Sequence, residues 1–96
     1  MTLFLSYDIS DNRTRTKFSK FLVKYGRRIQ MSVFEIRNSQ NYKTKIMAEI
    51  QTKWKPKFTK LDSVWIWEMT DNDAKKRITK LGHAEFEDNE VVMIGF

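Results

Sequence analysis

The 96-residue sequence contains no cysteine, one histidine, one proline and three glycines. The absence of cysteine excludes disulfides and thiolate metal sites, and it fits a reducing compartment. No stretch approaches the roughly 20 apolar residues of a membrane span. The first residues show neither the basic segment nor the apolar segment of a signal peptide. We therefore expect a cytoplasmic protein that does not contact a membrane.

The length predicts a single domain over residues 1–96. A chain of this size buries only roughly two-thirds of the surface that it exposes when unfolded, so an oligomer would help it. Hydrophobic residues make up 41% and charged residues 31% of the chain, which is ordinary for a globular protein.

Charge is divided unevenly along the chain, whose net charge is +6. Residues 1–60 carry 14 Lys and Arg against 4 Asp and Glu, whereas residues 61–96 carry 4 against 8. The basic part suits a polyanion such as nucleic acid, and the acidic part suits a basic protein partner. The alternative is that the charge serves solubility alone.

The stretch 3–26 organises the rest of the chain. An apolar strand over 2–7 leads into Asp8, and a polar turn over 9–12 precedes a helix over 13–26. The spacing predicts one buried stripe on this helix, formed by Phe18, Phe21, Leu22 and Tyr25. A basic stripe has the same spacing and consists of Arg13, Lys17, Lys20 and Lys24. We expect Gly26 to end the helix as a left-handed C-cap.

The remaining segments predict mostly strands. Residues 27–37 form two short strands joined by a tight turn, or one bent strand. A helix over 42–54 follows a loop over 38–41 and is ended by Pro56. The strand over 63–69 is apolar on both faces, so we expect it in the centre of the sheet beside the first strand. The chain is completed by a turn over 70–73, a helical turn followed by a short strand over 77–81, an acidic loop over 84–90 and an apolar strand over 91–96.

This order of segments predicts an α+β sandwich with two helices on one face of an antiparallel sheet. An uncovered apolar strand at the end of a chain invites aggregation, and pairing with the sheet of a second copy would cover it. The sequence therefore predicts a homodimer.

Bases and aromatic residues alternate over residues 53–58, Lys-Trp-Lys-Pro-Lys-Phe. This composition is typical of a nucleic-acid contact, in which cations meet phosphates and rings stack on bases. We favour the alternative, in which Trp54 and Phe58 anchor the segment to the core and the lysines are solvated.

Several motifs occur together in a familiar order: Tyr7-Asp8-Ile9 after the first strand, a basic helix ending in Tyr25-Gly26, residues 30–35 (Gln-Met-Ser-Val-Phe-Glu), and Asp62-Ser63-Val64. In this combination the whole chain resembles the small CRISPR-associated adaptation proteins of the Cas2 family. The sequence departs from that pattern in its short apolar tail and in the spacing of the charges after Asp8.

The resemblance implies a ferredoxin-like βαββαβ fold with an extra C-terminal strand that completes the sheet of the dimer partner. Residues 83–96 would then form an acidic loop and a strand for contacts with the dimer partner or another protein. It further implies a homodimer between two dimers of the CRISPR integrase, where it would help to insert new spacers. The partners would be protospacer DNA and, in some members, RNA.

Family members are also described as Mg²⁺-dependent endonucleases, and the resemblance implies that Asp8 is the metal ligand and catalytic residue. The expected nucleic-acid-binding residues are Arg13, Arg15, Lys17, Lys20, Arg27 and Arg28. Two Asp8 side chains facing each other across a dimer axis would make a reasonable magnesium site, because Mg²⁺ prefers oxygen ligands. We expect Asp11 to cap the helix rather than bind metal, and the single histidine, His83, to lie on the surface.

Four hypotheses remain open at the level of sequence. The first, which we favour, is a scaffold that holds DNA and binds the integrase, with the acidic part of the chain as the integrase contact. The second is a metal-dependent phosphodiesterase. The third is a toxin-type metal-dependent ribonuclease of the same fold, and the fourth is a small basic ribosomal-type protein.

Overall fold

The computed structural model describes residues 1–86. Along the chain its elements are β1 (Thr2–Asp8), α1 (Asn12–Val23), β2 (Arg27–Gln30), β3 (Val33–Arg37), α2 (Ser39–Glu49), the π-helix η1 (Ile50–Trp54), the 3-10 helix η2 (Lys55–Lys57), β4 (Ser63–Met69) and α3 (Asp71–Arg77). The strand expected over residues 91–96 and the end of the acidic loop lie outside the described residues. None of the helices within residues 1–86 has the length and apolar character needed to cross a bilayer.

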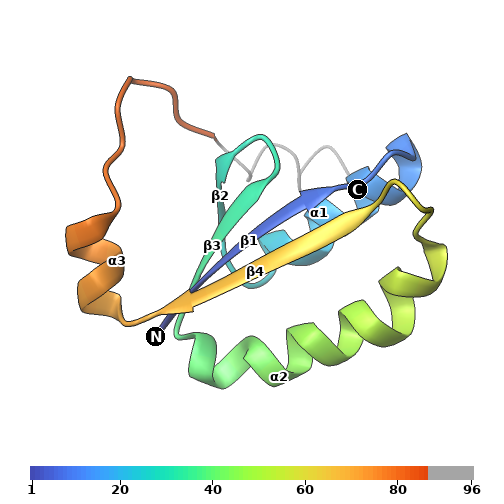
Figure 1. Ribbon diagram of the computed structural model, residues 1–96, viewed down its shortest axis with the longest axis horizontal. Coiled ribbons are helices and arrows are strands. Elements are labelled where there is room, and N and C mark those ends of the chain that lie inside the picture. Colours follow the sequence, from blue (N-terminus) through green and yellow to red (C-terminus); the bar gives the residue numbers. More distant parts are fainter. Residues whose placement is uncertain (87–96) are drawn as a thin grey trace.

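The strands form one sheet in the order β2-β3-β1-β4, and every pairing is antiparallel (Figure 1). Leu5 in the middle of β1 is paired with Phe34 of β3 on one side and Ile66 of β4 on the other. This topology is the ferredoxin-like α+β fold, which confirms the expected fold class. Residues 27–37 are two strands, so the first of the two alternatives for this stretch is correct.

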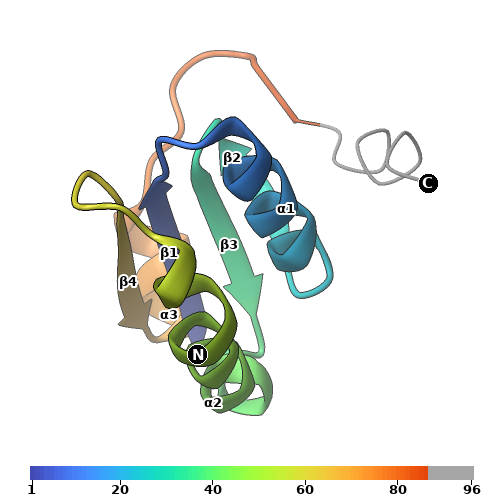
Figure 2. The ribbon, with the colours of Figure 1, turned by 90° about the vertical axis from the view of Figure 1, so that its right-hand side faces the viewer.

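Helices α1 and α2 cover the same face of the sheet, as Figure 2 shows. The core between them and the sheet consists of Leu3, Leu5, Tyr7, Ile9, Phe18, Phe21, Leu22, Phe34, Ile36, Ile46, Ile50 and Trp54. The buried stripe predicted for the first helix is confirmed for Phe18, Phe21 and Leu22, and Tyr25 packs partly buried against the core. Because β1 lies in the middle of this arrangement, its last residue is held in a fixed position.

Strand β4 lies beside β1 as expected, but among the strands of residues 1–86 it is at the edge of the sheet and not in its centre. Its side chains alternate between partly buried and exposed, because only one of its faces is covered by helices. The other face carries Trp65 and Trp67, which are 64% and 47% exposed and stack with their ring centroids 6.1 Å apart. The apolar residues on both faces of β4 therefore indicate a surface that residues 1–86 leave open, and not a central position among these strands.

Two predicted helix ends differ from the structure. Gly26 has no positive φ and lies beyond the end of α1, where its backbone approaches β3 so closely that an added Cβ would meet the Glu35 carbonyl oxygen. Glycine is needed there for close packing and not for a left-handed cap. The second helical segment begins at Ser39 and continues through Lys57, because Pro56 lies in the first turn of η2, where a missing N–H costs no hydrogen bond.

The helical turn predicted before residue 77 is confirmed, but the turn over 70–73 and the strand over 77–81 are wrong. Residues 71–77 form the helix α3, and the Thr70 Oγ1 atom caps it by accepting a hydrogen bond from the Asp73 N–H at 3.1 Å. Residues 78–81 have no regular structure and are exposed. Their apolar side chains imitate a strand, but no neighbouring strand in residues 1–86 pairs with them.

Candidate nucleic-acid interface

Asp8 lies at the end of β1, where a buried strand meets the surface. Tyr7 and Ile9 on either side of it are 4% and 1% exposed, whereas Asp8 itself is exposed. Its backbone is paired with Ser63 of β4. Within residues 1–86 no three His, Asp or Glu side chains come together as a metal site, so Asp8 is not part of such a cluster among these residues.

The loop after Asp8 is held by Asp62, which precedes β4. The Oδ1 atom of Asp62 accepts hydrogen bonds from the Ser10 N–H at 2.8 Å and from Ser10 Oγ at 2.9 Å. Its Oδ2 atom accepts from the Thr59 N–H at 2.8 Å. The backbone N–H groups of Thr59 and Ser10 lower the pKa of Asp62, because they stabilise its charged form. Asp62 thus connects the loop after β1 to the loop before β4.

Asp11 caps α1, as the sequence predicts. Its Oδ2 atom accepts a hydrogen bond from the Thr14 N–H at 2.8 Å and from Thr14 Oγ1 at 2.9 Å. These bonds lower the pKa of Asp11. The carboxylate is therefore engaged in the cap and sets the direction in which α1 leaves the loop.

Two arginines border a pocket of about 240 Å³ beside the end of β1. Arg15 donates from Nη1 to the Ile9 carbonyl at 2.9 Å and also bonds the Asn12 side chain. Arg28 donates to the Met31 carbonyl at 2.6 Å and to Ser19 Oγ at 2.9 Å. The pocket is also lined by Tyr7, Thr16, Ser19, Met31 and Ser32. Both guanidinium groups are held in place before any ligand arrives, which favours recognition of phosphate.

The other predicted basic residues are divided between two sides of the molecule. Arg13, Lys17 and Lys20 lie on α1, and none of them makes an ion pair within residues 1–86. Arg27 instead lies on the open face of the sheet and is paired with Glu35 at 2.8 Å. The structure therefore brings Arg15 and Arg28 together at one pocket, which Tyr7 also lines, and places Arg27 on the other face of the sheet.

Sequence reasoning gives Asp62 no role in the site. The only signal is its place in the Asp62-Ser63-Val64 motif, directly before β4. Asp62 contacts Thr59, three residues before it, and Ser10, about fifty residues before it. A local sequence pattern does not reveal the contact with Ser10. His83 lies in an exposed coil after α3, as the sequence predicts.

Comparison with known proteins identifies the family. The family model described as CRISPR associated protein Cas2 matches residues 1–77, which is most of the chain. The chain belongs to the Cas2 family. The motifs around Asp8, Gly26 and Asp62 all lie within the matched residues.

Individual Cas2 proteins are similar over shorter stretches. The CRISPR-associated endoribonuclease Cas2 of Mycobacterium tuberculosis (strain CDC 1551 / Oshkosh) is 40% identical over 50 residues, which are 52% of this chain and 44% of the relative. The CRISPR-associated endoribonuclease Cas2 4 of Rhodospirillum rubrum is 41% identical over 46 residues, 48% of this chain and 37% of the relative. The matched segment thus spans less than half the length of these curated relatives.

Solved structures agree with the family. The crystal structure of Streptococcus pyogenes Cas2 at pH 6.5 superposes with a TM-score of 0.66 and 26% identity, covering 85% of this chain and all of that one. A hypothetical protein, TT1823, from Thermus thermophilus gives a TM-score of 0.61 at 25% identity, covering 72% of this chain and 80% of that one.

Proposed function

We propose that this chain is the nucleic-acid-binding Cas2 subunit of a CRISPR adaptation complex. In this role two copies hold protospacer DNA and bridge two integrase dimers. The observation that carries the proposal is the Cas2 family match over residues 1–77. Within these residues Asp8 is exposed, and Arg15 is bonded to the carbonyl of Ile9, the residue that follows Asp8. The same match favours the CRISPR role over a toxin-type ribonuclease or a ribosomal protein.

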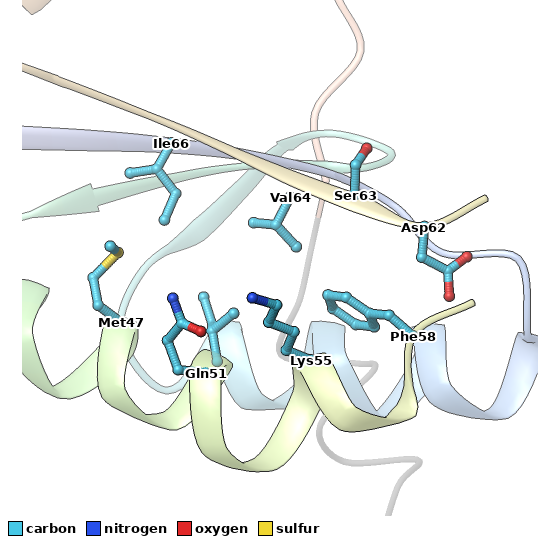
Figure 3. A pocket seen from close by; sticks show the side chains of 9 residues that line it. Met47, Gln51, Lys55, Phe58, Asp62, Ser63, Val64 and Ile66 are labelled. Carbon is cyan, nitrogen blue, oxygen red and sulfur yellow. The ribbon is translucent and has the colours of Figure 1, made fainter. Parts of the chain in front are cut away.

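A homodimer is supported by two open features of the sheet. Trp65 and Trp67 are exposed on the face that α1 and α2 do not cover, and the buried Phe4 lies next to Trp67 in the adjacent strand. The edge of β4 is also unpaired within residues 1–86. Beside this edge is a groove of about 360 Å³, lined mainly by apolar side chains such as Met47, Val64 and Ile66 (Figure 3). A second copy would cover the face, and its apolar C-terminal residues would suit the edge.

The donor set fits a bound Mg²⁺ only in part. Mg²⁺ takes one or two carboxylates and keeps several waters, so Asp8 would serve as one ligand and the Asp8 of a second copy as another. When bound, the ion would activate a water and stabilise charge on a phosphoryl group. The chain's own contribution is to hold Asp8 at the end of a buried strand and to present Arg15 and Arg28 toward phosphate.

The proposal is tested by an integration assay. The purified protein, its Asp8→Asn variant and the CRISPR integrase of the same organism are mixed with a short DNA duplex and a plasmid that contains the repeat. We expect integration to require this protein and to survive Asp8→Asn. Integration that proceeds without the protein would contradict the proposal.

A second candidate function is a Mg²⁺-dependent endonuclease. It is favoured by the endoribonuclease names of the relatives and by the exposed carboxylate of Asp8. This function predicts cleavage of RNA or DNA that needs Mg²⁺ and is lost in Asp8→Asn, with the Asp73→Asn variant of α3 as a matched control. Cleavage that is equal in both variants would indicate a contaminating nuclease.

A further inference from the structure

A second basic surface lies where η1 packs against α1. Trp54 of η1 is only 2% exposed, and its ring lies 5.3 Å from Phe18 and 5.6 Å from Phe21, measured between centroids. The Nζ atoms of Lys53 and Lys57 each lie 5.2 Å from the centre of the Trp54 ring. One buried indole therefore holds two ammonium groups, which are separated by at most twice that distance.

Helix α1 and its C-cap residue add two more cations on the side that carries Phe21. Lys17 and Lys24 lie four residues before and three residues after Phe21, so they share its side of the helix. Because Phe21 contacts Trp54, this side faces η1. We call Lys17, Lys24, Lys53 and Lys57 the seam lysines, and all four are exposed. Lys55 is not among them, because it points into the groove beside β4 (Figure 3).

The seam lysines are not neutralised by the chain itself. None of them makes an ion pair within residues 1–86, whereas Lys43, Lys80 and Arg27 do. Glu49 lies one turn before Lys53 but makes no ion pair with it. Attraction to the face of Trp54 holds two of the amines in place. The four like charges still repel one another, and a polyanion would relieve that repulsion.

The burial of the rings decides which polyanion fits. Proteins that bind single strands stack bases on exposed aromatic rings. Trp54 is buried and Phe58 is partly buried, so the rings of this segment are engaged in the core, as the sequence analysis favours. At this seam the ring that holds two of the cations is buried, and cations contact the phosphate backbone regardless of sequence. This chemistry fits a duplex, whose bases are already stacked.

We propose that the seam lysines are a second contact for the phosphate backbone of duplex DNA, in addition to the basic residues near the end of β1. The inference rests on the proposed function and specifies where the duplex lies, which is along α1. From Arg13 to the C-cap residue Lys24 the helical backbone spans about 16 Å at 1.5 Å per residue. That length corresponds to roughly five base pairs of a duplex.

The test is the salt dependence of binding to a fluorescently labelled DNA duplex. Each phosphate that a lysine neutralises adds about 0.9 to the slope of log K against log salt concentration. The variant Lys53→Gln/Lys57→Gln should therefore lower the magnitude of the slope by about 1.8. Lys53→Arg/Lys57→Arg should retain it. Lys75→Gln/Lys76→Gln removes the same charge from exposed positions on α3, at the opposite end of the molecule from η1, and should leave the slope unchanged (Figure 1).

The outcomes separate this inference from the proposed function. An unchanged slope in Lys53→Gln/Lys57→Gln, with a lower slope in Arg13→Gln/Lys20→Gln, would overturn the second contact and leave the proposed function intact. Absence of duplex binding by the unchanged protein would count against both. A slope change of the same size with single-stranded DNA, or a change seen only with duplex RNA, would overturn the assignment to duplex DNA.

Discussion

Asp62 holds the loop that follows Asp8. Its two carboxylate oxygens accept from the backbone of Ser10 on one side and of Thr59 on the other. Asp8 is itself paired with Ser63, the next residue after Asp62. The candidate site is therefore positioned by a residue that contacts neither a metal nor a phosphate in our proposal.

The first prediction concerns the pH dependence of this contact. Asp62→Asn replaces one acceptor oxygen by an NH₂ group, which cannot accept a backbone N–H, so we expect a lower urea midpoint at pH 7. The pKa of Asp62 is lowered below 3.8 in the folded protein by the N–H groups of Thr59 and Ser10. A carboxyl with a lowered pKa stabilises the fold above its unfolded pKa, and this contribution is lost as the pH falls through the folded pKa. The difference in midpoint between the two proteins should therefore be constant at neutral pH and shrink below about pH 4.

The measurement is urea unfolding followed by circular dichroism at pH 7 and at pH 3. Asp73→Asn on α3 is the matched control, because it changes the charge equally without touching the loop. A midpoint difference that is the same at both pH values would show that the charge of Asp62 is not responsible.

At the scale of elements, the π-helix η1 continues α2 along the chain and packs against α1. The wider turn of a π-helix shifts the side chains that follow it, and Trp54 at its end faces α1. Phe18 meets the Trp54 ring edge-on, with an interplanar angle of 85°. No group within residues 1–86 accepts a hydrogen bond from the buried Nε1 atom of Trp54. The ring is thus well packed but carries an unsatisfied donor.

The second prediction follows from this contrast. Trp54→Ala should lower the free energy of unfolding by about 3–5 kcal/mol, because it leaves a large cavity between α1 and η1. Trp54→Phe should cost less, because it retains an aromatic ring and removes the unsatisfied N–H, which itself costs about 1–3 kcal/mol. Urea unfolding followed by circular dichroism measures both values. Equal losses in the two variants would contradict the proposed packing.

Local patterns predict those elements whose partners are close in sequence or strongly apolar. The buried stripe of α1, the two strands within residues 27–37 and the helical face on one side of the sheet follow from such patterns. The position of β4 does not follow from such a pattern. An apolar residue in the sequence does not indicate whether this chain or a second one covers it. The apolar residues near 78–81 mislead for a related reason, since a strand requires a partner that the local sequence does not specify.

The candidate site shows the same division. The motif at Asp8 and the charges of α1 are visible in the sequence, and so is the cap formed by Asp11. The separation of Arg27 from Arg28 depends on which face of β2 each one occupies, and a strand of four residues does not reveal this without its register. The seam depends on contact between α1 and η1, more than thirty residues apart.

On the scale of the whole molecule, the two faces of the sheet differ in chemistry. One face is covered by α1 and α2 (Figure 2). The seam lysines lie on α1 and its C-cap and on η1 and η2, which follow α2. The other face presents two stacked tryptophans at the edge strand. This division separates a surface for a polyanion from a surface for protein, and it allows both to be occupied at once.

The third prediction tests whether the face that carries Trp65 and Trp67 is the dimer interface. A stable interface buries about 800 Å² on each partner and is most sensitive to buried aromatic residues near its centre. Trp65 is the most exposed residue of the stacked pair, so Trp65→Glu places a charge on the face that we expect a second copy to cover. Size-exclusion chromatography with light scattering should show a dimer for the unchanged protein and a monomer for the variant.

Leu61→Glu is the matched control, because Leu61 is 77% exposed but lies in the loop before β4, and this variant should remain dimeric. A Trp65→Glu variant that stays dimeric while folded would place the dimer contact elsewhere, and the open face would then need another occupant.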